Sequence, residues 1–162
     1  MTRKLSRLPS HAMARLVPAV ATLAALGLAA PAWAQAAPKA YATNCQLCHK
    51  PDGKGTPGVF PRLTGRVDAI AAHKDGRKWL IATVLYGQSG AITVDGKPVR
   101  GTMGPFARLS DKDIADTLNW LAQGKGRAFT PAEVAAVRGE PGWTLAKVGE
   151  MRKKLAGAGV IK

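Results

Sequence analysis

Apolar residues spaced three and four positions apart predict that most of the chain is helical. The clearest case is residues 110–123, where Ile114, Leu118 and Leu121 fall on one helical face and Ser110 is suited to the N-cap. Further helices are predicted over residues 39–45, 66–71, 78–86, 131–138 and 144–155. A capping box, in which Thr130 precedes Glu133 by three residues, predicts that a helix begins at Pro131.

Three stretches depart from this helical pattern. Residues 50–65 are rich in glycine and proline and predict a loop. Residues 91–100 place Asp95-Gly96 between two short extended runs, which indicates a β-hairpin, and Pro98 limits it to a small edge ribbon. The tail from Gly157 is expected to be frayed. The pattern therefore predicts an all-α fold with one small hairpin.

The first 34 residues have the layout of a secretory signal peptide. Four basic residues precede an apolar run over residues 16–30, and Ala32-Trp33-Ala34 forms an A-x-A cleavage signature. Pro18 and Pro31 argue against the alternative of an uncleaved membrane anchor. We expect cleavage after about Ala34 and a periplasmic mature chain.

Candidate chemistry is concentrated in one motif, a C-x-x-C-H run formed by Cys45, Cys48 and His49. This is the spacing that attaches a c-type haem. Two thiols add to the two haem vinyl groups, and the adjacent imidazole lies below the iron as an axial ligand. Both cysteines of the chain belong to this motif, so we predict one covalent haem c.

Other uses of the two cysteines fit the sequence less well. A disulfide is the default in an oxidising compartment, and a C-x-x-C pair also occurs in thioredoxin-like redox centres. The flanks of the motif contain no buried strand of the kind that precedes a thioredoxin-like centre. A zinc site has only three clustered ligands here, since His73 is isolated.

A second axial ligand is expected from Met103, which lies between flanking glycines in residues 101–106, just before the strongest helix. Glycines allow the backbone to approach a porphyrin closely, and a methionine sulfur would close the iron and raise its reduction potential. Met151 lies in a basic helix without such a loop, and His73 is expected on the surface. We therefore predict His49 and Met103 as the iron ligands.

With its haem motif near the N-terminus and a methionine loop followed by a helix, the chain resembles class I c-type cytochromes. This resemblance implies helices packed around a largely buried haem, with Tyr41 on the first helix packed against the last core helix near Trp120. Residues 61–65 resemble the family's P-x-L-x-G turn, which implies that the Pro61 carbonyl accepts the hydrogen bond of the axial histidine. Trp79 is a candidate for the haem propionate environment or an ordinary core residue.

The predicted organisation is a signal peptide over 1–34, a cytochrome c domain over 35–123 and a helical C-terminal extension over 124–162. The hairpin at 91–100 and the extension resemble those of cytochrome subunits of membrane-bound dehydrogenases and of oxidase-linked cytochromes. Whether the extension packs over the core or holds a partner is left open by the sequence.

Charge adds a prediction about partners. The chain has 24 Lys and Arg against 10 Asp and Glu, and a mature chain without the leader keeps a net charge of +10. Such a surface favours acidic redox partners, such as a dehydrogenase, oxidase or reductase, including one in a membrane complex. Nucleic acid is not expected as a partner. The basic residues near the haem loops, expected to form a docking ring, are Lys50, Lys54, Arg62, Arg66, Arg100 and Arg108.

With both axial positions taken, the expected function is one-electron transfer between redox partners rather than enzymatic catalysis. The alternatives are a haem subunit fixed in a dehydrogenase or reductase complex, and a gas-binding or peroxidatic haem protein. A gas-binding or peroxidatic protein requires an open iron site or a second haem, and the sequence indicates neither.

Overall fold

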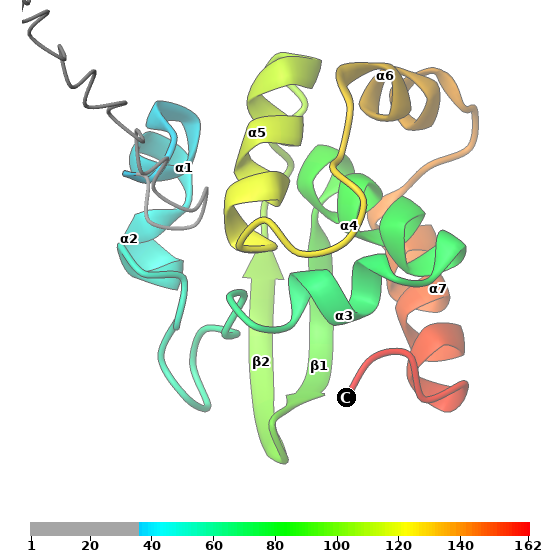
Figure 1. The fold of residues 1–162 in the computed structure, drawn as a ribbon. Coiled ribbons are helices and arrows are strands. Elements are labelled where there is room, and N and C mark those ends of the chain that lie inside the picture. Colours follow the sequence, from blue (N-terminus) through cyan, green and yellow to red (C-terminus); the bar gives the residue numbers. More distant parts are fainter. Residues whose placement is uncertain (1–35) are drawn as a thin grey trace, which may run out of the picture.

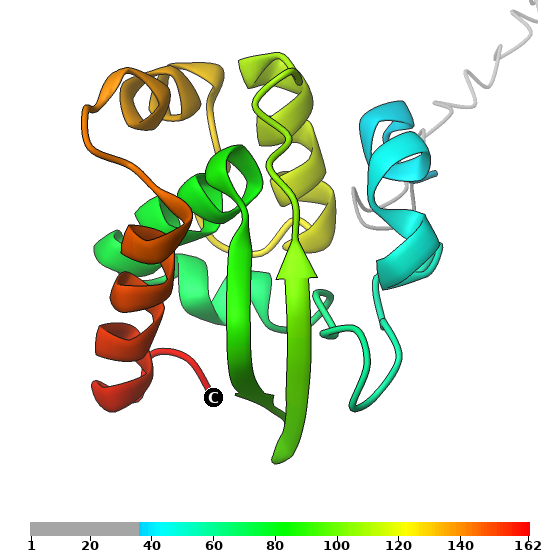
Figure 2. The same cartoon turned by 180° about the vertical axis from the view of Figure 1, so that it is seen from behind.

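The computed structural model describes residues 36–162, so the predicted signal peptide lies outside the described residues. The chain order of elements is α1 (Lys39–Asn44), α2 (Gln46–His49), α3 (Val67–Ala71), α4 (Lys74–Tyr86), β1 (Gln88–Val94), β2 (Lys97–Met103), α5 (Asp111–Leu121), α6 (Pro131–Gly139) and α7 (Leu145–Gly157). Helices dominate, and one two-stranded antiparallel hairpin runs along one face of the molecule (Figures 1 and 2). Within this part of the chain, no helix has both the length and the apolar character of a membrane span.

Local sequence signals account for several element boundaries. The hydroxyl of Ser110 caps α5 by accepting from the Asp113 N–H at 3.1 Å. Thr130 and Glu133 form the predicted capping box of α6. The hairpin turns at Asp95-Gly96 as predicted, although its strands extend beyond residues 91–100, from Gln88 to Met103.

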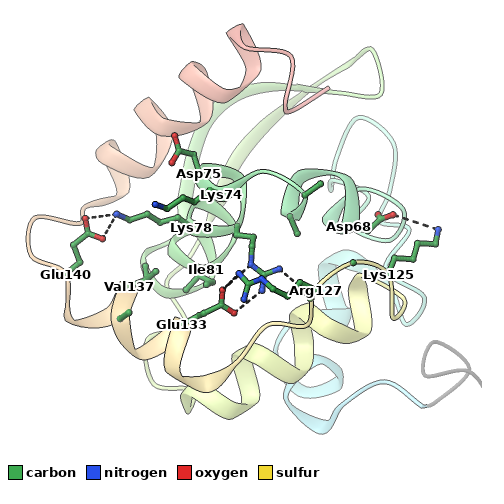
Figure 3. A pocket seen from close by; sticks show the side chains of 15 residues that line it. Asp68, Lys74, Asp75, Lys78, Ile81, Lys125, Arg127, Glu133, Val137 and Glu140 are labelled. Carbon is green, nitrogen blue, oxygen red and sulfur yellow. Dashed lines mark hydrogen bonds and ion pairs between the residues drawn. The ribbon is translucent and has the colours of Figure 1, made fainter.

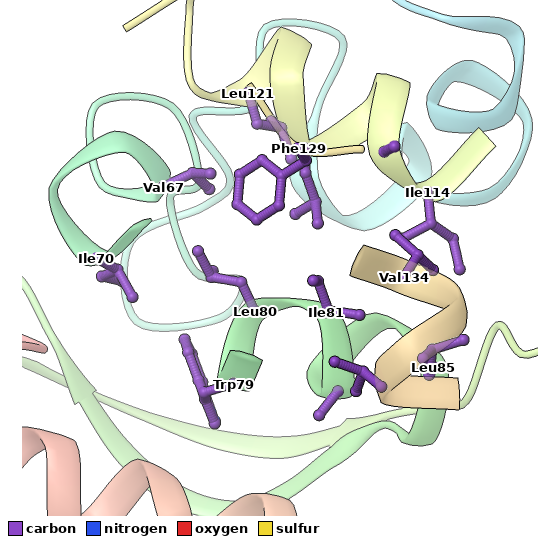
Figure 4. Close-up of a cluster of buried hydrophobic side chains, with 14 of the residues drawn as sticks. Val67, Ile70, Trp79, Leu80, Ile81, Leu85, Ile114, Leu121, Phe129 and Val134 are labelled. Carbon is purple, nitrogen blue, oxygen red and sulfur yellow. The ribbon is translucent and has the colours of Figure 1, made fainter. Parts of the chain in front are cut away.

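The core lies between α3, α4, α5 and α6, and Figure 4 shows its side chains facing one another from these helices. Ile81, Leu85, Ile114, Leu118 and Val134 are almost completely buried. Burying large apolar side chains contributes about 1.5–3 kcal/mol each, which makes this cluster the main stabilising feature.

Tyr41 joins the N-terminal helix to this core. Its ring packs against Trp120 with the centroids 4.6 Å apart, which confirms the predicted contact between the first helix and the last core helix. The buried Tyr41 hydroxyl donates to the Lys50 carbonyl at 2.6 Å, and burial raises the pKa of Tyr41 well above its usual value. The same residue thus fixes α1 and the backbone that follows the C-x-x-C-H motif.

The C-terminal extension packs on the core. Phe129, which precedes α6, inserts its ring among the core helices (Figure 4) and exchanges two hydrogen bonds with the Asn119 side chain. Val148 and Leu155 of α7 are buried, and so is Ile161 at 4% exposure. The prediction of a frayed tail from Gly157 is therefore wrong, because Ile161 returns to the core after α7 ends.

Ion pairs fasten this extension across a crevice of about 800 Å³ between α4 and α6 (Figure 3). Buried Arg77 donates to both carboxylate oxygens of Glu133, at 3.2 and 2.9 Å, and to the carbonyls of Arg127 and Ala128. Burial alone would raise the pKa of Glu133, but hydrogen bonds from Arg77 and Arg127 outweigh it and lower the pKa to about 2. A second pair joins Lys78 to Glu140 at 2.7 Å.

Candidate functional site

The C-x-x-C-H motif folds as a single helical turn. Cys45 caps α1, and α2 begins at the next residue and ends at His49. Positions three and four apart lie on one face of a helix, so Cys48 and His49 share the side of Cys45 while Leu47 points outward, 87% exposed. Neither cysteine forms a disulfide. Burial raises the pKa of Cys45 to about 11, and the nearby Cys48 makes a smaller contribution in the same direction.

His49 is buried and held in one orientation. Its Nδ1 lies 2.9 Å from the Pro61 carbonyl oxygen, and because a carbonyl can only accept, Nδ1 carries the proton. Burial lowers the pKa of His49, and the Pro61 hydrogen bond only partly opposes it. The imidazole is therefore neutral, and the lone pair on Nε2 is available to a metal.

The loop over residues 50–65 places the Pro61 carbonyl. Gly55 donates to the His49 carbonyl at 2.9 Å, and Leu63 donates to the Gly53 carbonyl at 2.8 Å. Gly55 has a φ of 63°, and a Cβ there would lie 2.4 Å from the Phe60 carbonyl oxygen. Only glycine combines this backbone conformation with so close an approach, so it allows the loop to fold back onto the motif.

Met103 is the last residue of β2 and pairs in register with Gln88 on β1. The expected loop position was wrong, because the hairpin continues up to the methionine. Gly87 allows the Met103 backbone to approach the end of α4 closely, because a Cβ at this position would lie 2.6 Å from the Met103 carbonyl oxygen. Met151 packs against the hydrophobic core, and His73 is exposed at the start of α4.

All six predicted site residues line one cavity of about 480 Å³: Cys45, Cys48, His49, Pro61, Trp79 and Met103. This volume is in the range of about 300–1,000 Å³ that is usual for ligand pockets. Among the described residues, three buried polar atoms of the cavity wall have no hydrogen-bond partner: Trp79 Nε1, Thr83 Oγ1 and Gln88 Oε1. An apolar cavity with thiols, imidazole, thioether and unpartnered polar atoms suits a large flat cofactor with polar edge groups. These are the features of a c-type haem pocket.

Known proteins agree with this chemistry. Residues 34–125 match the family model described as cytochrome c. Cytochrome c-552 of Thermus thermophilus is 42% identical over 125 residues, which cover 72% of this chain and 94% of that protein. The cytochrome c subunit of the quinone alcohol dehydrogenase of Gluconobacter oxydans is 31% identical over 96 residues, 59% of this chain and 19% of that protein. The chain therefore belongs to the cytochrome c family, and this membership implies a covalently attached c-type haem.

Other cavity residues were not anticipated from the sequence. Thr83, Gln88 and Arg152 all line it. A signal for Arg152 is present, because it follows Val148 by four residues and precedes Leu155 by three, which puts it on the buried face of α7. The lysines on the same helix, Lys147, Lys153 and Lys154, made the segment resemble an exposed basic helix.

The predicted basic ring is only partly free. Lys50, Lys54, Arg100 and Arg108 are exposed, although Lys54 pairs with Asp52 at 3.1 Å and Arg108 donates to the Asn44 side chain at 2.6 Å. Arg62 donates to both carboxylate oxygens of Asp95, at 3.0 Å each, and Arg66 is partly buried.

Replacing Met103 by alanine tests the second ligand. We predict that the weak band at the red end of the ferric spectrum, which reports iron–sulfur ligation, disappears in Met103→Ala. Met151→Ala is the matched control, since it removes a thioether outside the cavity and should leave the band intact. A band that survives in Met103→Ala would refute the ligand assignment.

Proposed function

We propose that this protein is a one-electron carrier in which His49 and Met103 are the two axial ligands of a haem c attached through Cys45 and Cys48. The observation that carries the proposal is that the motif, Pro61 and Met103 line one cavity, in which Pro61 holds the His49 ring. When bound, the haem supplies a reversible one-electron couple between ferric and ferrous iron. The two ligands leave no position for a substrate, so the protein itself is not an enzyme.

The side chains around the cavity then have distinct roles. Pro61 holds the His49 ring at a fixed orientation and strengthens its donation to the metal. Met103, as a thioether ligand, favours the ferrous state and raises the reduction potential. Apolar burial acts in the same direction, because it disfavours the additional positive charge of ferric iron.

We infer that electrons pass through the cavity edge near Cys48. Apolar side chains are exposed there or in the adjoining loop: Leu47 at 87%, Val59 at 53% and Phe60 at 37%. The exposed cations Lys50, Lys54, Arg100 and Arg108 belong to the segments that line or flank the cavity. An apolar centre with surrounding positive charge suits a transient contact with an acidic redox protein, in an interface below about 1,200 Å².

Export and pathway are further parts of the proposal. The basic leader and its A-x-A signature support a periplasmic location after cleavage near Ala34. The similarity to a cytochrome c subunit of a quinone alcohol dehydrogenase supports a second candidate function, a haem subunit held in a dehydrogenase or reductase complex. Both candidate functions use the same haem site.

Carbon monoxide binding separates an electron carrier from a gas-binding or peroxidatic protein. We predict that the reduced protein shows almost no spectral change with carbon monoxide at neutral pH, because Met103 occupies the second axial position. Met103→Ala should bind carbon monoxide strongly, and Met151→Ala should behave as the unmodified protein. Strong binding by the unmodified protein would contradict the proposal and favour the open-site class.

The positive docking surface can be tested with small redox reagents. We predict that the reduced protein reacts faster with anionic hexacyanoferrate(III) at low than at high ionic strength, because salt screens attraction between exposed charges. Lys50→Glu should slow this reaction and accelerate oxidation by the cationic tris(phenanthroline)cobalt(III).

Lys153→Glu, the same charge reversal at an exposed position of α7, is the control and should have a smaller effect. Equal effects of Lys50→Glu and Lys153→Glu would refute a local docking surface. The reduction potentials of all variants are measured alongside, so that a change in driving force is not mistaken for steering.

A further inference from the structure

The charged side chains that line the haem cavity are all basic. They are Arg62, Arg66, Arg100 and Arg152, and no Asp or Glu of the described residues lines the cavity. Cations around a largely apolar cavity repel one another and lose hydration, so they are favourable only when an anion lies among them. The cavity wall therefore indicates a ligand with negatively charged groups.

Arg152 is the most deeply placed of these cations. It comes from α7 in the C-terminal extension and is 8% exposed. Its guanidinium donates to the Thr93 carbonyl of β1 at 2.9 Å, and among residues 36–162 no carboxylate forms an ion pair with it. Arg77 is equally buried, at 7%, but its charge is neutralised by Glu133. Arg152 thus has the burial of Arg77 without the compensating carboxylate.

Arg66 lies beside Arg152 at the start of α3. Its guanidinium donates to the backbone carbonyls of Arg62 and Lys162. Burial lowers the pKa of Arg66, and the nearby charges of Arg62 and Arg152 lower it further, whereas Asp95 opposes this. Asp95 itself is paired with Arg62.

Arg100, the fourth cation of the wall, is exposed to solvent. Arg152 is therefore the buried cation of the cavity wall with no compensating carboxylate among the described residues, whereas the charge of Arg66 is opposed in part by Asp95, which Arg62 already pairs with.

A haem has two anionic groups, its propionates, on the edge of the porphyrin opposite the vinyl groups that bond to cysteines. Figures 1 and 2 place α2, which carries Cys48, and α7, which carries Arg152, on opposite sides of the molecule. We propose that Arg152 of the C-terminal extension, together with Arg66, binds the haem propionates, so that the extension completes the haem pocket. This inference rests on the proposed occupation of the cavity by haem.

The contact has a measurable consequence for the reduction potential. A guanidinium compensates the carboxylate charge and keeps the propionate ionised throughout the neutral pH range. Without Arg152, the uncompensated carboxylate stabilises ferric iron, and the propionate takes up a proton at higher pH. The potential then falls as the pH rises through the propionate pKa, because the ionised carboxylate favours the ferric state.

The test is the midpoint potential of the haem-loaded protein between pH 5 and 9 in Arg152→Gln, Arg152→Lys and Lys153→Gln. We expect Arg152→Gln to shift the ferric-to-ferrous ratio about tenfold towards ferric at a fixed ambient potential near neutral pH, which is about 59 mV for one electron. We also expect a pH-dependent potential that the unmodified protein lacks. Arg152→Lys keeps the charge and should retain a flat pH profile.

Lys153→Gln removes the same charge from an exposed position of α7 and should leave the profile unchanged. A purely structural role for Arg152 would lower thermal stability without a pH-dependent potential, and that result would overturn the proposal. The spectrum of each variant reports covalent haem and the iron–sulfur band, so a failure of the haem site is distinguished from a failure of this inference.

Should Arg152→Gln not fold, a crystal structure of the unmodified haem-loaded protein decides the question. A guanidinium nitrogen of Arg152 within about 3 Å of a propionate oxygen supports the proposal. Propionates directed away from Arg152 overturn it.

Discussion

The hydrogen bond between His49 Nδ1 and the Pro61 carbonyl, at 2.9 Å, connects the haem motif to the rest of the pocket. It fixes the tautomer of a buried imidazole and leaves Nε2 free for a metal. The glycine-rich loop exists in its observed form because this carbonyl must return to the motif, and Gly55 permits the close approach. The sixteen residues 50–65 form no regular element predicted from the sequence, yet their fold holds the His49 ring in one orientation.

The C-terminal extension packs on the core and contributes a residue to the cavity wall. Phe129 enters the core, Arg77 and Glu133 fasten α6 to α4, and α7 packs against β1 and presents Arg152 to the cavity. The extension is therefore continuous with the haem-binding part in packing, although the family match ends at residue 125. A separate role as a detachable partner-binding tail does not fit this burial.

Sequence reasoning succeeded where the signal was local. Caps at Ser110 and Thr130, the Asp95-Gly96 turn and the motif at 45–49 each depend on a few neighbouring residues. The six candidate residues, named from the motif, the flanking glycines and the family resemblance, all line one cavity.

Tertiary contacts explain most of what was missed. Helix α4 begins at Lys74, four residues earlier than predicted, where Gly76 lets it pack directly on the Ile70 backbone. Ile161 and Arg152 are buried by contacts with segments that are distant in sequence. The helical pattern of residues 144–155 does not reveal such contacts. Met103 ends a strand because its partner Gln88 lies fifteen residues away.

We propose that His49 and Met103 hold the iron in a closed, six-coordinate site. X-ray absorption at the iron edge tests it most directly, since sulfur and nitrogen neighbours scatter differently. We predict one sulfur and five nitrogen neighbours in both the ferric and ferrous protein, and no sulfur in Met103→Ala. Five-coordinate iron, or six nitrogen or oxygen neighbours in the unmodified protein, would contradict the account.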